Sequence, residues 1–223
     1  MGIAIGMTVL MAGLFGKLRA NAKRKESDEE SSETLMLVGL GNPGKDYDRT
    51  RHNVGFDVLD SFAAQHCIEI KKKKFGGLIG DGMIGGKKVL LVKPQKYMNL
   101  SGQVVATAAG FYQLPIENII VVTDDMALEP GRIRLRAKGS AGGQKGLADI
   151  KNKLGTMEFA RLRVGIGRSE YIAARDYVLG RPTSDERKLI DKAVDRSKEA
   201  LYCWVNEGID RAMNKYNVND NEQ

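Results

Sequence analysis

Cysteine and histidine are scarce in this sequence, and their scarcity excludes several kinds of site. The chain of 223 residues has two cysteines, Cys67 and Cys203, which give neither a disulfide framework nor the paired spacing of a metal site. We therefore expect two reduced thiols. Histidine occurs twice, as His52 and His66, so any chemistry that needs an imidazole is limited to two positions.

Long hydrophobic segments are also missing. The apolar run over residues 3–15 is too short to span a bilayer, lacks the preceding positive residues of a secretory signal and has no obvious cleavage site. Gly6 stands where the myristoylation pattern requires Ser or Thr. We interpret residues 1–34 as a disordered extension or as sequence upstream of the true start, with an organelle-targeting segment as the alternative, and we expect no membrane association.

Acidic residues are fewer than basic ones, with 28 Asp and Glu against 35 Lys and Arg. The formal net charge is +7, and residues 1–34 hold five basic and five acidic side chains that cancel, so the whole excess lies on residues 35–223. A folded body of that charge suits a polyanionic partner such as nucleic acid, although a soluble basic surface gives the same count. The apolar content of 42% is ordinary for a globular domain.

Short apolar runs alternate with segments of helical periodicity. We predict strands at 35–40, 78–84, 88–92, 119–123, 133–137 and 162–166, and helices at 53–65, around 104–112, at 143–154 and after Pro182. Thr183 and Glu186 form a capping-box pattern, whereas the lysine run 71–74 is typical of a solvated loop. This alternation predicts one α/β domain over residues 35–217, with a central mixed, mostly parallel sheet, helices on both faces and a flexible tail over 218–223.

The first turn contains a G-x-G-x-x-G pattern over residues 39–44. A dinucleotide site needs a helix that opens directly from this turn, so that its N-terminal amides hold the pyrophosphate. Here Pro43 and a polar stretch follow, and the first helix begins only near Asn53. We therefore disfavour a dinucleotide-dependent enzyme and interpret the glycines as a tight turn that exposes Asn42.

His52 and a pair of aspartates are the best candidates for chemistry. His52 lies at the entry of the first helix, where it is either a general base or a histidine that satisfies backbone groups. Asp124 and Asp125 follow an apolar strand, and one of them could accept a hydrogen bond from the histidine or cap a loop. Because side chains alternate along a strand, we expect only one of the two to point into the site.

Two asparagines extend this set. Asn42 and Asn99 each fit a helix cap or an amide that binds a peptide or a developing oxyanion. The sequence has no nucleophilic serine in a G-x-S-x-G elbow and no histidine–cysteine metal spacing. These absences favour direct attack by water, without a covalent intermediate, and we expect neither a metal nor another cofactor.

Basic residues alternate along the predicted strand at 133–137. Arg134 and Arg136 would share one face, while Ile133 and Leu135 face the core. The next glycine-rich turn opens a helix, and Arg161 and Arg163 repeat the alternation. The pattern fits a solvated edge or a surface that binds RNA phosphates, and the positive body favours the second.

Taken together, five motifs resemble bacterial-type peptidyl-tRNA hydrolase. They occur in the order and spacing of that family, and the resemblance extends from about Leu35 to Asn217. None would suffice alone, but jointly they are specific. The motifs are GLGNPG at 39–44, TRHNVG at 50–55, KPQKYMNLSG at 93–102, DD at 124–125 followed by PG at 130–131, and RLRVGIG at 161–167.

The resemblance implies a monomeric cytoplasmic enzyme that recycles tRNA by hydrolysing the ester of peptidyl-tRNA. It implies that His52 activates water with support from Asp124. Asn42 and Asn99 would place the peptide and its ester carbonyl, and Tyr47 and Met98 would flank the cleft. Arg136 and Arg163 fall where the family has basic residues that contact tRNA phosphates. We expect Arg134, which shares the predicted strand face with Arg136, to contact the tRNA as well.

The chain departs from the family pattern at two places. Gln144 and Lys145 stand where the family usually has His-Asn, whose asparagine contacts the peptide and helps hold the water. We expect Lys145 to contact the substrate, although lysine donates hydrogen bonds and cannot accept them. Ala127 replaces a common aspartate. The alternative is a non-catalytic RNA-binding protein on the same fold, like an organellar splicing factor of plants, but the retained pair of His52 and Asp124 favours the enzyme.

Overall fold

The computed structural model describes residues 33–218 of the chain. The first strand begins at Thr34, one residue before the predicted start of the domain. The predicted extension lies outside the described residues except for Glu33 and Thr34, and so does the predicted tail beyond Val218.

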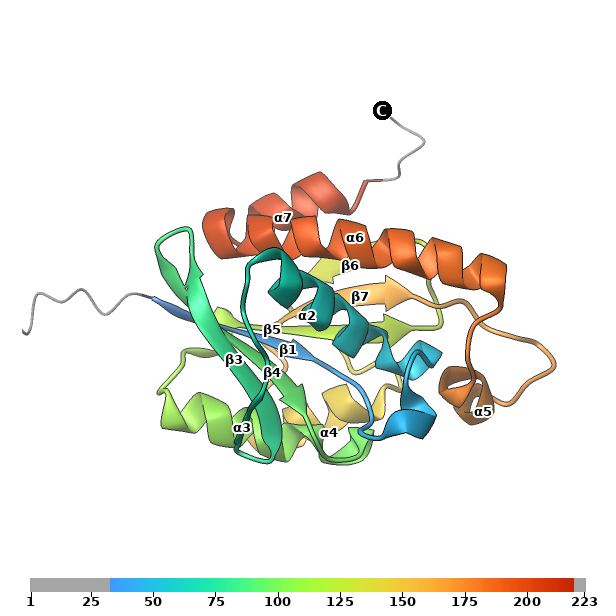
Figure 1. Ribbon diagram of the computed structural model, residues 1–223, viewed down its shortest axis with the longest axis horizontal. Helices are drawn as coiled ribbons and strands as arrows, with labels where there is room; N and C mark the ends of the chain where they lie inside the picture. Colours follow the sequence, from blue (N-terminus) through green and yellow to red (C-terminus); the bar gives the residue numbers. More distant parts are fainter. Residues whose placement is uncertain (1–32, 219–223) are drawn as a thin grey trace, which may run out of the picture. The chain divides into compact units, whose positions relative to one another are not determined.

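One seven-stranded mixed sheet forms the centre of the fold (Figure 1). Its order is β2-β3-β4-β1-β5-β7-β6, and the inner strands β4, β1, β5 and β7 are parallel to one another. The outer strands β2, β3 and β6 are antiparallel to their neighbours. The strands are β1 (Thr34–Gly39), β2 (Lys72–Lys74), β3 (Gly77–Ile84), β4 (Lys87–Pro94), β5 (Ile119–Asp125), β6 (Ile133–Arg136) and β7 (Ala160–Gly165).

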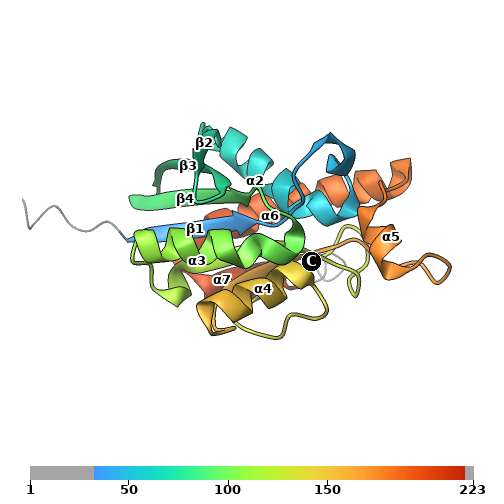
Figure 2. The ribbon, with the colours of Figure 1, turned by 90° about the horizontal axis from the view of Figure 1, so that it is seen from below.

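Helices cover both faces of the sheet, as predicted (Figures 1 and 2). The first face carries α2 (Val54–Gln65), α6 (Ser184–Glu207) and α7 (Ile209–Tyr216). The second carries α3 (Ser101–Phe111) and α4 (Lys145–Leu154). The short elements between them are η1 (Lys45–Tyr47), η2 (Arg51–Asn53), η3 (Met98–Leu100), η4 (Ile116–Asn118) and α5 (Ala174–Leu179).

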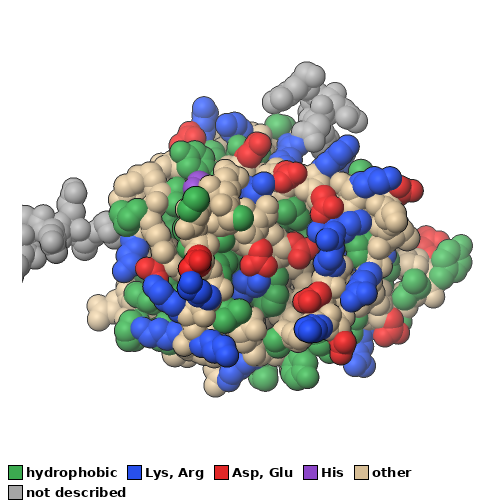
Figure 3. Space-filling model, viewed as in Figure 1, with side chains coloured by type: hydrophobic (Ala, Val, Ile, Leu, Met, Phe, Trp, Pro, Cys, Tyr) green, Lys and Arg blue, Asp and Glu red, His purple; other side chains and the backbone are tan. Residues whose placement is uncertain are grey.

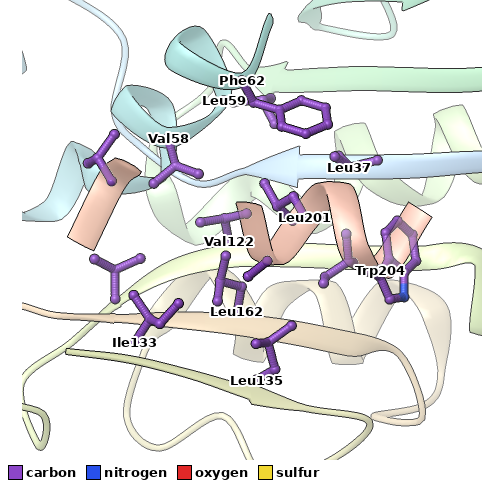
Figure 4. Packing of buried hydrophobic residues seen from close by; sticks show 14 of the residues in the cluster. Leu37, Val58, Leu59, Phe62, Val122, Ile133, Leu135, Leu162, Leu201 and Trp204 are labelled. Carbon is purple, nitrogen blue, oxygen red and sulfur yellow. The ribbon is translucent and has the colours of Figure 1, made fainter. Parts of the chain in front are cut away.

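Two hydrophobic layers hold the helices on the sheet. Because β1 is buried on both faces, its apolar run is continuous rather than alternating. Figure 4 shows the layer under α2 and α6, where Phe62, Val122 and Trp204 belong to one cluster of buried side chains. Each large apolar side chain buried there contributes about 1.5–3 kcal/mol.

Gly39 at the end of β1 and Gly55 in α2 allow the helix to lie very close to the sheet. A Cβ at Gly39 would lie 2.3 Å from the Gly55 carbonyl oxygen, and a Cβ at Gly55 would lie 2.6 Å from backbone atoms of Leu40 and Val122. No α-helix opens from Gly44, because the short η1 follows it. Gly39 and Gly55 thus serve helix–strand packing, and the turn at Gly44 lacks the helix of a dinucleotide site.

The two edges of the sheet are protected in different ways. The run 71–74 was predicted as a loop, which is wrong, since Lys72–Lys74 pairs with β3 as an edge strand. Lysines on an edge oppose pairing with another chain. At the other edge, the Leu135 N–H donates to Asn217 Oδ1 at 2.8 Å, and Asn217 Nδ2 donates to the Leu135 carbonyl at 3.1 Å.

The long C-terminal helix begins as predicted. Thr183 and Glu186 form the predicted capping box, with both reciprocal hydrogen bonds present. The helix ends at Glu207 and is followed by Gly208, whose φ of 85° favours glycine, and α7 comes next as a separate helix. The apolar pattern continues across Gly208, so it does not reveal this break.

Substitutions at two helical glycines, one tightly packed and one open, test the close packing of α2. We expect Gly55→Ala to lower the free energy of unfolding by about 1–3 kcal/mol, because the added methyl meets backbone that cannot move aside. Gly110→Ala in α3 is the control, since a Cβ there has no neighbour within 4 Å, and should be neutral or stabilise by up to about 1 kcal/mol. Urea unfolding of both variants checks this, and equal midpoints would contradict it.

Candidate active site

His52 and Asp124 meet at the end of the sheet where β1, β4 and β5 finish. His52 Nδ1 lies 2.8 Å from Asp124 Oδ2, although 72 residues separate them. The side chains are 12% and 4% exposed. Nε2 of His52 has no protein partner among the described residues. The carboxylate therefore orients the ring with Nδ1 inward and leaves Nε2 for another molecule.

The two neighbouring aspartates do have different partners. Asp124 faces the side of α2, while Asp125 Oδ2 forms an ion pair with Arg163 Nε at 2.5 Å. Asp125 Oδ1 accepts a hydrogen bond from the Ala127 N–H at 2.9 Å. Strand alternation thus divides a carboxylate for the imidazole from one that holds an arginine.

Asn42 is bound into the site by three hydrogen bonds. Its N–H donates to Asn53 Oδ1 and its carbonyl accepts from Asn53 Nδ2, each at 2.9 Å. Its Oδ1 accepts from the Met98 N–H at 2.8 Å. The expectation that the turn exposes Asn42 is wrong, because the residue is 6% exposed. Its Nδ2 has no partner among the described residues and remains available to a ligand.

Asn53 was missed by the sequence analysis, which placed it only as a helix start. Its side chain forms hydrogen bonds with both backbone groups of Asn42. Because Asn53 directly follows His52, these bonds tie the segment that carries His52 to the turn after β1. The one available signal was its position directly after the histidine. Such a reciprocal amide contact depends on the fold and has no pattern of its own in the sequence.

Arg51, on the other side of His52, fixes the short helix η2. Its guanidinium donates to the carbonyls of Tyr177 and Arg181 and to Glu186 Oε2 at 2.8 Å, and it lies 4.1 Å above the Tyr177 ring. Although burial raises the pKa of Glu186, the bonds from Thr183 and the charge of Arg51 hold that pKa below its usual value. This network holds η2 against α5 and the start of α6.

The remaining predicted substrate contacts lie nearer the surface. Tyr47 is half-buried and meets the exposed Tyr97 edge to face at a centroid distance of 6.5 Å. Met98 is buried beside Asn42. Asn99 and Lys145 are exposed, and neither makes a side-chain hydrogen bond to the described residues. The structure thus joins Asn42 and Met98 to the histidine pair and leaves the other polar groups open to solvent.

Comparison with known proteins decides the family. The family model described as peptidyl-tRNA hydrolase matches residues 36–223. The chain is 49% identical over 184 residues to the peptidyl-tRNA hydrolase of Clostridium acetobutylicum, which covers 82% of this chain and 97% of that protein. The chain belongs to the peptidyl-tRNA hydrolase family. The resemblance found in the sequence motifs is thereby confirmed.

Solved structures of peptidyl-tRNA hydrolase share the fold. The crystal structure of the enzyme from Acinetobacter baumannii has a TM-score of 0.79 and 39% identity, covering 84% of this chain and 96% of that chain. A peptidyl-tRNA hydrolase crystallised with N-propanol gives 0.79 and 38% identity, covering 83% and 95%. The predicted α/β class with a central mixed sheet is confirmed.

Arg134 and Arg136 on β6 and Arg163 on β7 form what we call the basic stripe of this member of the hydrolase family. Ile133 and Leu135 are buried, Arg136 is exposed, and Arg134 pairs in register with Arg163. Figure 3 shows the opposite layer, α2 and α6, where acidic and basic side chains are mixed. The alternation of β6 is therefore as predicted, and its charges share the face of α3 and α4.

Arg161 does not belong to this stripe, although it has the predicted spacing. It is 1% exposed, and its guanidinium donates to backbone carbonyls before and after α4. The acceptors are the carbonyl oxygens of Gly139, Ser140, Met157 and Phe159. The expectation of a solvated or RNA-facing Arg161 is wrong, because these two loops fold over the side chain and use all its terminal donors.

Within residues 33–218, no three or more His, Cys, Asp or Glu side chains are grouped so as to hold a metal ion. The helices in that part of the chain are also too short or too polar to cross a membrane. His66, the second histidine, stacks on Tyr202 at 5.6 Å, and burial lowers its pKa. It lies at the far end of α2 from His52.

Methionine substitutions at a register pair separate the buried arginine from an exposed one. Arg161 and Arg136 are cross-strand partners. We expect Arg161→Met to cost more than about 2 kcal/mol of stability, because it leaves buried carbonyls without donors. Arg136→Met should change stability by less than about 0.5 kcal/mol. Thermal unfolding provides the measurement, and a small effect at Arg161 would refute the structural role.

Proposed function

We propose that this chain hydrolyses the ester bond of peptidyl-tRNA by means of a water molecule that His52 activates. The observation that carries the mechanism is the 2.8 Å contact between His52 Nδ1 and Asp124 Oδ2. A carboxylate on Nδ1 fixes the tautomer in which Nε2 is unprotonated and able to accept a proton. Membership of the peptidyl-tRNA hydrolase family indicates that the substrate is the ester of a peptide with tRNA.

The reaction consists of two proton transfers around one tetrahedral intermediate. Water on His52 Nε2 gives its proton to the ring as its oxygen attacks the ester carbonyl carbon, and Asp124 stabilises the imidazolium. The intermediate collapses, the bond to the 3′ oxygen of the tRNA breaks, and the imidazolium returns the proton to that oxygen. The products are a free peptide acid and a free tRNA.

Substrate contacts follow from the groups that remain open. Asn42 Nδ2, the Asn99 amide and the Lys145 ammonium offer donors for the peptide and the developing oxyanion. Tyr47 and Met98 offer apolar surface beside them. Lys145 also adds positive charge where the peptide carbonyls would lie. Its ammonium can hold the water molecule only by donating a hydrogen bond to the water oxygen.

The RNA contacts in this proposal are Arg134, Arg136 and Arg163. Arg136 is exposed and has no side-chain partner among the described residues. Arg163 already forms an ion pair with Asp125, so a contact between Arg163 and a phosphate competes with that ion pair. We therefore rank Arg136 as the strongest of the three phosphate contacts.

We further propose that the enzyme acts as a monomer in the cytoplasm. There it would recycle tRNA by removing peptides from peptidyl-tRNA that stalled ribosomes have released. The family resemblance supports this setting, and an organelle is the alternative if residues 1–34 are a targeting segment. A non-catalytic RNA-binding role is not favoured, because it has no need of an oriented imidazole.

Alanine at each histidine tests the proposed base. We expect His52→Ala to reduce turnover of N-blocked aminoacyl-tRNA by at least ~100-fold, the scale of lost general-base catalysis. His66→Ala is the matched control and should keep turnover within about twofold, because His66 lies at the other end of α2. Wild-type turnover in His52→Ala would exclude the mechanism. Absence of turnover in the wild-type chain, with RNA binding retained, would favour the non-catalytic role.

The salt dependence of tRNA binding tests Arg136. Loss of one phosphate contact should lower the slope of log K against log salt by about one in Arg136→Ala. Lys192→Ala, an exposed charge on α6, should leave the slope unchanged. Filter binding of uncharged tRNA over a series of salt concentrations gives both slopes, and equal slopes would remove Arg136 from the RNA site.

A further inference from the structure

Gln144 connects the first turn of α4 to the carboxylate that holds His52. Its Oε1 accepts a hydrogen bond from the Leu147 N–H at 2.9 Å and so caps α4. Its Nε2 lies 3.2 Å from Asp124 Oδ1, the carboxylate oxygen that His52 does not use. Only one orientation of the amide satisfies both contacts, because Leu147 offers a donor and the carboxylate offers acceptors.

The surroundings of Gln144 confine its side chain. Nε2 also lies 3.2 Å from Met98 Sδ. A Cβ at Gly146 would lie 2.7 Å from Met98 Sδ and 3.0 Å from Gln144 Oε1, so the first turn of α4 packs directly on Met98. Further along α4, Asp149 Oδ2 accepts from the Gly102 N–H at 2.7 Å. The amide therefore reaches Asp124 from a fixed helix end.

We propose that Gln144 is a positioning residue for the His52–Asp124 pair, an inference that rests on the function proposed above. With His52 on Oδ2 and Gln144 on Oδ1, the carboxylate has a donor on each oxygen and cannot rotate without losing one. The amide is neutral, so it orients the carboxylate without cancelling the charge that stabilises the imidazolium. A lysine or arginine at this position would orient Asp124 and cancel that charge.

The size of the expected effect is moderate. The Thr123 hydroxyl also lies 3.3 Å from Asp124 Oδ1, so loss of the Gln144 donor loosens the carboxylate without leaving this oxygen unpaired. His52 keeps its own contact. The role of Gln144 should therefore appear in the rate of the chemical step and in its pH dependence, and much less in substrate binding.

Gln144→Glu separates the two contacts. The variant keeps an oxygen for the Leu147 N–H, so α4 keeps its cap, while the donor to Asp124 is replaced by a second carboxylate oxygen. We expect kcat for N-blocked aminoacyl-tRNA to fall about 10- to 100-fold while KM changes less than about threefold. The acidic fall of activity should move to higher pH, because the added negative charge favours the protonated imidazole.

Asn152→Asp is the matched control. It makes the same amide-to-carboxylate exchange at an exposed position of the same helix, and it should keep the wild-type kcat and pH profile. Thermal unfolding of both variants verifies that the helix is intact. A wild-type kcat and pH profile in Gln144→Glu would overturn the proposal and leave Gln144 as a helix cap only.

A second measurement needs no substrate. The proton on His52 Nδ1, observed by NMR in the wild-type chain, should exchange with water faster in Gln144→Glu and at the wild-type rate in Asn152→Asp. Equal exchange in all three proteins would also overturn the proposal. If the wild-type chain fails to hydrolyse peptidyl-tRNA, the proposed function is wrong, and the exchange rates still decide whether Gln144 holds the pair.

Discussion

The contact between His52 and Asp124 depends on how several other parts of the fold are packed. His52 lies just before α2 and Asp124 lies near the end of β5, so they meet only if α2 lies tightly on the sheet. Gly39 and Gly55 permit that approach, since a Cβ at either would overlap backbone. Arg51 then fixes the turn that carries the imidazole. Substantial parts of the packing thus serve one hydrogen bond of 2.8 Å.

The elements that carry the site were largely predictable because their signals are local. Strand β5 is a continuous apolar run, and its period of two divides Asp124 from Asp125 without any knowledge of the tertiary structure. The capping box at Thr183 is equally local. The motifs, taken jointly, identified the family. The roles of the site residues stay predictions, although the contact between His52 and Asp124 has the geometry that such roles require.

What the sequence could not predict depends on segments that meet only in the folded chain. Arg161 and Arg163 have the same spacing, yet loops on either side of α4 bury the first. Lys72–Lys74 has no apolar pattern, and it is a strand only because β3 offers it a partner. Gln144 reaches Asp124 because α4 starts at the end of β5, a placement that no periodicity encodes.

The amide of Asn217 occupies the outer edge of β6 as a neighbouring strand would, with one donor and one acceptor. A chain that ended before this residue would present the bare backbone of Leu135 to other copies. The arginine-bearing strand would then become a template for intermolecular sheet growth. Asn217, the residue that follows α7, therefore covers the backbone edge of β6, although it lies far in sequence from His52 and Asp124.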